Sequence, residues 1–243
     1  MKKSYEKSEI WFAVVWIIIY VVVMGNLRNN FGDGSPVSLL GLGIIAAVLT
    51  VFIVKNKLTQ KYGLTGVHDA KKCLFFIPLV LLISVNFWSG ISLHYDGMNQ
   101  VFAVLSMALV GYIEEIVFRG LLFKAIEKNN VKRAIIISAV TFGAGHIINL
   151  LTGQATVDTI LQIVYAIAIG LAFVMVFYIS KSLIPCIVTH SLIDITSKFS
   201  ADTSTTMDYI IAVFIIIVAG GYTIYLTKQQ DTVQLWHSGR HTQ

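Results

Sequence analysis

The sequence predicts an all-α bundle of membrane-spanning helices that forms a single integral-membrane domain over residues 1–243. Of the 243 residues, 56% are hydrophobic and only 13% are charged, and the mean hydropathy is +0.76. Soluble domains average roughly 45–50% apolar and about 25% charged residues. The apolar residues also gather in long runs, and cations alternate between the loops that join these runs. Together these observations exclude a soluble globular domain, a disordered chain and a disulfide scaffold.

The apolar runs predict about eight transmembrane helices. A bilayer core about 30 Å thick needs about 20 mostly apolar residues in a helix, which satisfies its own backbone where water is absent. We expect spans at residues 10–26, 37–54, 73–94, 100–123, 134–151, 159–180, 183–198 and 208–227. The seventh run is short and polar. The first follows three lysines, as a signal peptide would, but no small-residue cleavage site follows it, so we expect it to be retained.

The loop charges support the count and predict the topology. Of the 18 Lys and Arg residues, 15 precede the first span or follow the second, fourth, sixth or eighth. The other loops hold Arg28, Lys198 and five aspartates. The positive-inside rule therefore predicts that both termini are cytoplasmic, and omitting the seventh span would destroy the alternation. Because topology accounts for the net charge of +5, we expect no nucleic-acid partner.

Ionisable residues inside the spans are the main functional signal. Such groups cost several kcal/mol each and usually face a protein interior or a cavity. The sequence has six of them: Glu114, Glu115, Arg119, His146, His190 and Asp194. Since they occur only in the fourth, fifth and seventh spans, we expect these three helices to enclose a polar site.

The fourth span contains two neighbouring carboxylates with different expected roles. Glu115 and Arg119 are four residues apart, so they share a helical face and can form an internal ion pair. Glu114 is rotated by ~100° from Glu115 and lacks Arg119 as a direct partner. An unpaired buried carboxyl can act as a general base or acid.

Two further pairs share a helical face by the same spacing. In TFGAGH, His146 follows Phe142 by four residues, and Gly143 and Gly145 are expected to allow close helix approach. In HSLID, His190 precedes Asp194 by four residues, so the carboxylate can orient the imidazole.

The depths of the candidate residues allow them to meet. Glu114, His146 and His190 lie roughly 13, 18 and 10 Å from the cytoplasmic ends of their expected spans, at ~1.5 Å per residue. We therefore expect one site in the cytoplasmic half of the membrane.

A carboxylate and two imidazoles fit two kinds of amide hydrolysis. Glu114, His146 and His190 can bind Zn²⁺ and leave one position for water. Without a metal, Glu114 and His146 can activate a water while His190 and a neighbouring group donate hydrogen bonds to the oxyanion. The sequence has no HExxH zinc signature, and both schemes stay open.

The segments EEIVFRG, FGAGH and HSLID, in this order and each in its own span, resemble the three motifs of the CPBP family. That family groups CAAX prenyl proteases with bacteriocin-processing and immunity proteins of the Abi group, and its pattern is EExxxR, FxxxH and HxxxN. The resemblance covers a catalytic core of about residues 100–198. It implies a water-activating Glu114 with His146 as partner, a supporting set of Glu115, Arg119 and Phe142, and oxyanion stabilisation by His190 and residue 194.

Position 194 departs from the family pattern, because this chain has Asp194 where the family typically has Asn. An amide donates a hydrogen bond to an oxyanion, whereas an ionised aspartate cannot. We therefore expect Asp194 to be protonated, to orient His190, or to help hold a metal. The family has been described both as glutamic peptidases and as metalloproteases, and Zn²⁺ is the cofactor to consider.

These observations predict an intramembrane endopeptidase that cuts a membrane-associated peptide or protein near the cytoplasmic face. Lys outnumbers Arg 14 to 4, a bias common in low-GC bacteria, so we expect a bacterial plasma-membrane enzyme of pheromone or bacteriocin maturation, or of immunity. Two alternatives stay open: an ion- or proton-coupled transporter, and a non-catalytic immunity or partner-binding protein. The first would be supported by inverted repeats or broken helices, and neither is evident in the sequence.

Overall fold

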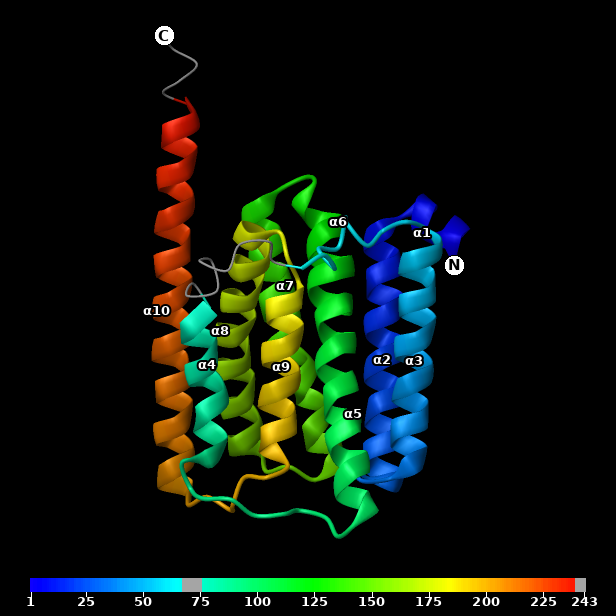
Figure 1. The fold of residues 1–243 in the computed structure, drawn as a ribbon, viewed down its shortest axis with the longest axis vertical. Helices are drawn as coiled ribbons and strands as arrows, with labels where there is room; N and C mark the ends of the chain where they lie inside the picture. The colour runs from blue at the N-terminus through cyan, green and yellow to red at the C-terminus, as the bar shows by residue number, and fades with distance from the viewer. Residues whose placement is uncertain (67–75, 239–243) are drawn as a thin grey trace.

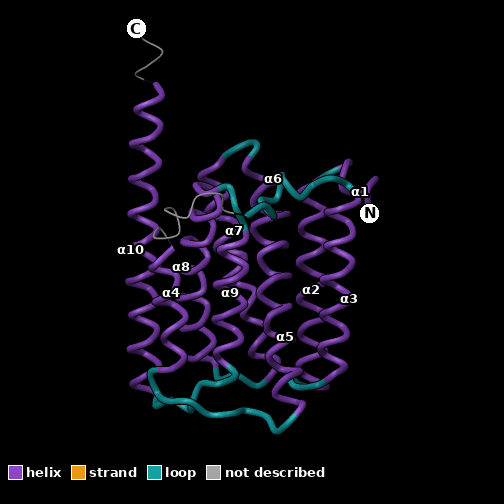
Figure 2. Tube along the Cα trace, viewed as in Figure 1, coloured by secondary structure: helices purple, strands orange, loops and turns teal. Residues whose placement is uncertain are grey.

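The fold is a bundle of roughly parallel and antiparallel helices (Figures 1 and 2). The computed structural model of the chain describes residues 1–66 and 76–238, and within these ranges it contains helices and no strand. The helices are α1 (Lys2–Lys7), α2 (Glu9–Phe31), α3 (Pro36–Lys55), α4 (Ile77–Ser84), η2 (Val85–Phe87), α5 (Met98–Glu114), η3 (Glu115–Phe123), α6 (Lys124–Glu127), α7 (Val131–Gly145), η4 (His146–Thr152), α8 (Thr156–Ser180), α9 (Ile184–Ser197) and α10 (Thr205–Ser238).

The chain is a multi-pass membrane protein, as the sequence predicts. In the described part of the chain, six helical segments are long and apolar enough to cross a bilayer: Glu9–Phe31, Pro36–Lys55, Met98–Glu127, Val131–Leu151, Thr156–Ser180 and Thr205–Gln229. Two apolar helices are shorter, Ile77–Phe87 and Ile184–Ser197. The eight expected spans therefore become six long helices and two short ones.

The third expected span differs most from its prediction. Its first residues, 73–75, lie outside the described residues, and α4 with η2 ends at Phe87 rather than at residue 94. Eleven helical residues extend only ~16 Å, which is about half of a bilayer core. The chain after Gly90 instead runs beside the segment that follows α9, where Ser92 N–H donates to the Phe199 carbonyl oxygen at 2.9 Å.

The ends of the helices follow the alternation of the loop charges. In Figure 1, α1, α6 and the end of α10 lie at one end of the bundle, and the connections α2–α3, α4–α5 and α9–α10 lie at the other. Local sequence fixes several of these ends. Ser35 and Pro36 begin α3, and the Asn130 side chain accepts a hydrogen bond from the Arg133 N–H at the start of α7.

Glycines bring the site-bearing helices close together at two points. A Cβ on Gly111 of α5 would lie 2.5 Å from the Ser191 nitrogen of α9, and a Cβ on Gly143 of α7 would lie 2.4 Å from Ile167 Cγ1 of α8. Only glycine fits at such distances. The expectation for Gly145 was wrong, because a Cβ there would meet only Phe118 Cζ, at an ordinary 3.9 Å.

Candidate active site

The two neighbouring glutamates lie at the junction of α5 and η3, a π-helical segment. In η3 all nine residues are buried. Glu115 Oε1 accepts a hydrogen bond from Arg119 Nη1 at 2.9 Å, and neither side chain has exposed surface. The Arg119 guanidinium also lies 4.1 Å from the ring centroid of Phe142. The predicted ion pair is confirmed, and its cation is further stabilised by an aromatic face.

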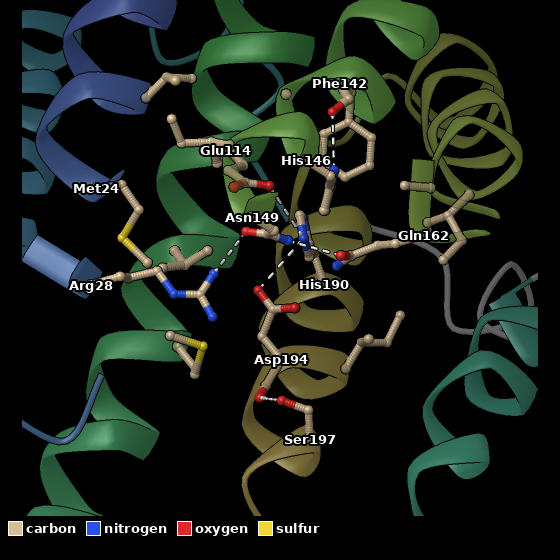
Figure 3. A pocket seen from close by; sticks show the side chains of 18 of the residues that line it. Met24, Arg28, Glu114, Phe142, His146, Asn149, Gln162, His190, Asp194 and Ser197 are labelled. Atoms are coloured by element: carbon tan, nitrogen blue, oxygen red, sulfur yellow. Dashed lines mark hydrogen bonds and ion pairs between the residues drawn. The ribbon is translucent and has the colours of Figure 1, made fainter. Parts of the chain in front are cut away.

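His190 joins these carboxylates to α9. Its Nδ1–H donates to Glu115 Oε1 at 2.8 Å, and its Nε2 lies 3.6 Å from both Glu114 Oε2 and Asp194 Oδ2 (Figure 3). The ring packs edge-on against Phe142 at 5.4 Å. The expected proximity of His190 and Asp194 is therefore found, whereas the contact with Glu115 was not foreseen.

His146 lies at the point where α7 changes into η4. Its Nδ1–H donates to the Phe142 carbonyl oxygen at 3.3 Å, and the two rings meet edge-on at 5.4 Å. With Nδ1 protonated, Nε2 of the neutral ring is the acceptor nitrogen. Phe142 thus contacts both histidines and Arg119, which gives the supporting role implied for it a structural basis.

Tyr20 of α2 completes the surroundings of Glu114, and sequence reasoning missed it. The buried Tyr20 hydroxyl donates to Glu114 Oε1 at 2.6 Å. Glu114 therefore has a hydrogen-bond partner from a distant helix, and Arg119 pairs with Glu115 instead, as expected. A tyrosine inside an apolar run is an ordinary residue of a membrane helix. Because the candidates were the acidic, basic and histidine residues of the spans, Tyr20 was not among them.

A cavity of about 240 Å³ connects these groups. Its lining includes Tyr20, Glu114, His146, His190 and Asp194. Helices α2 and α8 supply further walls beside the three helices that the sequence singled out. A cavity needs about 10–15 Å³ on this measure to hold one water molecule, so there is room for several waters.

The helix bounds change the expected depth of the site. Glu114 lies near the middle of the segment Met98–Glu127, and His146 lies only five residues from the end of Val131–Leu151. That end faces away from the termini (Figure 1). With the orientation that the loop charges predict, the site lies near the middle of the bundle rather than in its cytoplasmic half. The extension of the fourth span to Glu127 and the start of the fifth at Val131 rather than residue 134 cause the difference.

The residues as placed do not form a metal-binding set. Among the described residues, no group of three or more His, Cys, Asp or Glu side chains is arranged to hold a metal ion. His190 Nδ1 is already engaged by Glu115, and its Nε2 is 3.6 Å from the nearest Glu114 oxygen. Two ligand atoms that lie about 2.0–2.2 Å from one tetrahedral zinc ion are themselves well over 3 Å apart, so this separation does not decide against a shared metal. Glu114, His146 and His190 line one cavity, and the zinc scheme for them stays a prediction.

The arrangement is suited to proton transfer at a confined water. Glu114 offers a carboxylate oxygen toward the cavity, His146 offers an acceptor nitrogen, and His190 is held by Glu115 and Arg119. For His190 Nε2 to donate a hydrogen bond while Nδ1 donates to Glu115, the ring must carry both protons. Two acceptors and, in the doubly protonated ring of His190, one hydrogen-bond donor then line one cavity, and groups of these kinds are used in acyl-transfer chemistry.

A comparison with protein families agrees with the motifs. The family model "Type II CAAX prenyl endopeptidase Rce1-like" matches residues 97–196. This segment contains all three motifs, and the family is the one that the resemblance indicated. No curated protein and no solved structure matches the chain.

Proposed function

We propose that this chain hydrolyses peptide bonds inside the membrane with Glu114 as general base. The premise is the match of residues 97–196 to the Rce1-like CAAX endopeptidase family model. The family assignment suggests a CAAX-type intramembrane protease. The observation that most directly supports the assignment of residues is the convergence of Glu114, His146 and His190 on one cavity from three separate helices.

In the proposed reaction, Glu114 takes a proton from a water that also hydrogen-bonds to His146 Nε2. The water oxygen attacks the carbonyl carbon of the scissile bond, and the carbonyl oxygen becomes an oxyanion. Glu114 then gives the proton to the departing amine as the C–N bond breaks. One residue serves as base and then as acid, so no net proton is gained or lost by the enzyme.

His190 is proposed to stabilise the oxyanion through Nε2–H. Its Nδ1–H bond to Glu115, backed by Arg119, fixes the plane of the ring. Asp194 is proposed to orient and charge-balance His190, because its Oδ2 lies 3.6 Å from the same Nε2. This role is compatible with Asp194 in place of the family's Asn, because a carboxylate that cannot donate when ionised can still hold an imidazolium in place.

The test is cleavage of a membrane peptide library by the purified full-length chain in lipid nanodiscs, read by mass spectrometry. Glu114→Gln, His146→Ala and His190→Ala are each expected to reduce the rate by about 10²-fold or more, because each removes a proton-transfer or oxyanion group. Glu6→Gln, a change in an exposed helix α1 side chain, serves as the matched control and should cleave like the wild type. Wild-type rates from Glu114→Gln would contradict the assignment.

Metal dependence is tested separately on the same substrates. We expect protein treated with chelator and shown metal-free by elemental analysis to keep its activity, since the described residues gather no ligand set. Activity that disappears with the metal and returns with Zn²⁺ alone would overturn the metal-free route and favour the zinc scheme.

For the biological setting we propose a bacterial plasma membrane and a role in maturing peptide pheromones or bacteriocins, or in immunity to bacteriocins. The support is the family resemblance together with the excess of Lys over Arg, 14 to 4. Comparing the membrane peptidome of cells that carry the wild type with that of cells that carry Glu114→Gln should reveal uncut precursors in the latter. Identical peptidomes would contradict a processing role.

A further inference from the structure

A second, smaller cavity lies outside the candidate active site, at the end of the bundle that carries α1 and α6 (Figure 1). Its volume is about 80 Å³. The walls come from three segments: the turn after α3, the junction of η3 with α6, and the end of α8. Three lysines and one glutamate line it, namely Lys61, Lys124, Lys181 and Glu127. We call this cavity the lysine pocket.

The lysine pocket lies at the level where helices leave the membrane. Lys124 and Glu127 are in the last turn of the spanning segment Met98–Glu127, and Lys181 directly follows the segment Thr156–Ser180. The loop charges predict that this end of the bundle is cytoplasmic. The exposed Lys181 can therefore meet both the head groups of anionic lipids and anions from the water.

The positive charges of the pocket exceed its own negative charge. Lys124 donates to Glu127, the carboxylate of the lining. Lys61 Nζ lies 2.8 Å from Oε1 of Glu9, outside the pocket, and Glu9 is shared with a further lysine at 2.7 Å. No carboxylate in the described part of the chain lies within ion-pair distance of Lys181. Three ammonium groups thus share the pocket with one carboxylate.

Aromatic rings hold two of these ammonium groups without neutralising them. Lys181 Nζ lies 4.2 Å from the ring centroid of Tyr178, and Lys124 Nζ lies 5.8 Å from that of Phe177. A ring face attracts a cation and leaves N–H donors available. Partial burial outweighs the attraction of Glu127 and holds the pKa of Lys181 below its ordinary value, and the Lys124 charge acts in the same direction as burial. An anion in the pocket would favour the charged form of Lys181.

The backbone at Lys181 favours a different residue type. Its φ of +58° lies in the left-handed region, where it ends α8 and its N–H donates to the Phe177 carbonyl oxygen at 2.9 Å. Glycine is the usual residue at this position of a helix end, because a side chain there is strained. Lysine therefore has a conformational cost at this position, and what it adds is an ammonium group beside the pocket.

We propose that the lysine pocket binds a phosphate group, with Lys61, Lys124 and Lys181 as hydrogen-bond donors from three separate segments. Lysine is a common phosphate ligand, and basic pockets at the cytoplasmic side of membrane helices bind lipid head groups. A water molecule needs about 10–15 Å³ on this measure, so the pocket has room for roughly five to eight waters, and a phosphate group has five non-hydrogen atoms.

The phosphate can belong to a lipid head group or to a soluble phosphate, because both present the same charged oxygens. The lining of the lysine pocket shares no residue with the lining of the candidate active site. The inference therefore stands apart from the proposed function.

Two binding measurements on the full-length chain in maltoside micelles distinguish the two sources. Native mass spectrometry, titrated with dioleoyl phosphatidic acid or dioleoyl phosphatidylcholine, gives the affinity of the first bound lipid. Equilibrium dialysis with radiolabelled inorganic phosphate, at an ionic strength held constant with potassium chloride, gives the affinity and number of bound anions. We expect phosphatidic acid to bind about tenfold tighter than phosphatidylcholine, or one phosphate ion to bind per chain with saturation. A lipid ratio near one together with no saturable phosphate binding would overturn the proposal.

Two substitutions of the unpaired lysine separate binding from folding. Lys181→Gln should reduce the lipid ratio, or the phosphate affinity, about tenfold. Lys181→Gly removes the same cation and relieves the left-handed backbone, so it should lose binding equally in a protein at least as stable as the wild type, as thermal unfolding measures. Lys57→Gln is the matched control: Lys57 is exposed, has a φ of +57° and does not line the pocket, so this variant should bind like the wild type.

Glu127→Gln separates anion binding from structural pairing. It removes the carboxylate that competes for Lys124 and should keep or increase the affinity. A loss in Glu127→Gln as large as that in Lys181→Gln would show that the lysines act by pairing with the protein's own carboxylate, which overturns the proposal. Equal losses in Lys57→Gln and Lys181→Gln would overturn it as well, because binding would then follow the general positive charge of this face.

Discussion

Glu114 and Glu115 show how two neighbouring residues acquire different surroundings. Glu115 is fully buried and engaged by Arg119 and His190, whereas Glu114 faces the cavity and accepts a hydrogen bond from Tyr20. The difference arises from the rotation of about 100° between consecutive helical residues. One carboxylate is held in a buried ion pair and the other lines the cavity.

Arg119→Met is expected to destabilise the protein by about 3–5 kcal/mol, because it leaves the charge of Glu115 buried without its cation. The methionine keeps much of the packing against Phe142, so the loss reports mainly on the charge. Denaturant-induced unfolding in detergent micelles measures the change. A loss of less than about 1 kcal/mol, the range of exposed ion pairs, would show that the pair contributes little.

Tyr20→Phe is expected to lower kcat about tenfold with little change in KM. The hydroxyl positions the carboxylate of Glu114, and it does not lie at the end of the cavity away from Glu114. Steady-state cleavage of a library-derived peptide gives both constants. Tyr112→Phe is the matched control: its hydroxyl hydrogen-bonds Thr50 at 2.7 Å, and Tyr112 is not part of the cavity lining. Equal losses in the two variants would mean that Tyr20 acts only through helix packing.

At the scale of the elements, irregular helix occurs where the site is built. The segment η3 that carries Glu115 and Arg119 is π-helical, and η4, which begins at His146, is a 3₁₀ helix. π-segments are rare and often occur at functional sites.

The two glycines of FGAGH give a matched pair of helix-packing predictions. Gly143→Ala should destabilise the protein by about 1–3 kcal/mol, since its Cβ would overlap Ile167 of α8 and push α7 away. Gly145→Ala should change stability by less than about 0.5 kcal/mol, because its Cβ would make only an ordinary contact. Thermal unfolding of both variants in the same micelles provides the comparison. Equal destabilisation would contradict the packing that separates them.

At the scale of the whole molecule, Asp33 ties the α2–α3 hairpin to the end of α9. Burial alone would raise the pKa of the Asp33 carboxyl, but Arg28 and Lys198 outweigh burial and hold that pKa below its ordinary value. A carboxyl with a lowered pKa in the folded state stabilises the protein above its unfolded pKa of about 3.9, and this stabilisation is lost as the pH falls toward the folded value.

Unfolding measured from pH 7 to pH 3 should therefore show a loss of stability below about pH 4 that is smaller in Asp33→Asn than in the wild type. The variant lacks the titrating group, so its curve should be flatter in that range, although it is less stable at pH 7. Asp202→Asn, a change in the α9–α10 connection of the same face, is the control and should follow the wild-type curve. A variant curve as steep as that of the wild type would contradict the contribution of Asp33.

The sequence by itself determined the class of the molecule and the parts of its site that depend on local geometry. Hydropathy gave the membrane bundle, and the four-residue spacing gave the pairs Glu115–Arg119, Phe142–His146 and His190–Asp194, because helical periodicity fixes which side chains share a face. The ordered motifs gave the resemblance to the CPBP family, and a CAAX endopeptidase family model matches the segment that contains them. Only the tertiary structure brought Tyr20 to Glu114, joined His190 to Glu115, placed Arg28 and Lys198 on the cavity lining and shortened the third expected span. These features depend on how helices distant in the chain pack and where they end, and a local pattern carries no information about a partner that approaches from another helix.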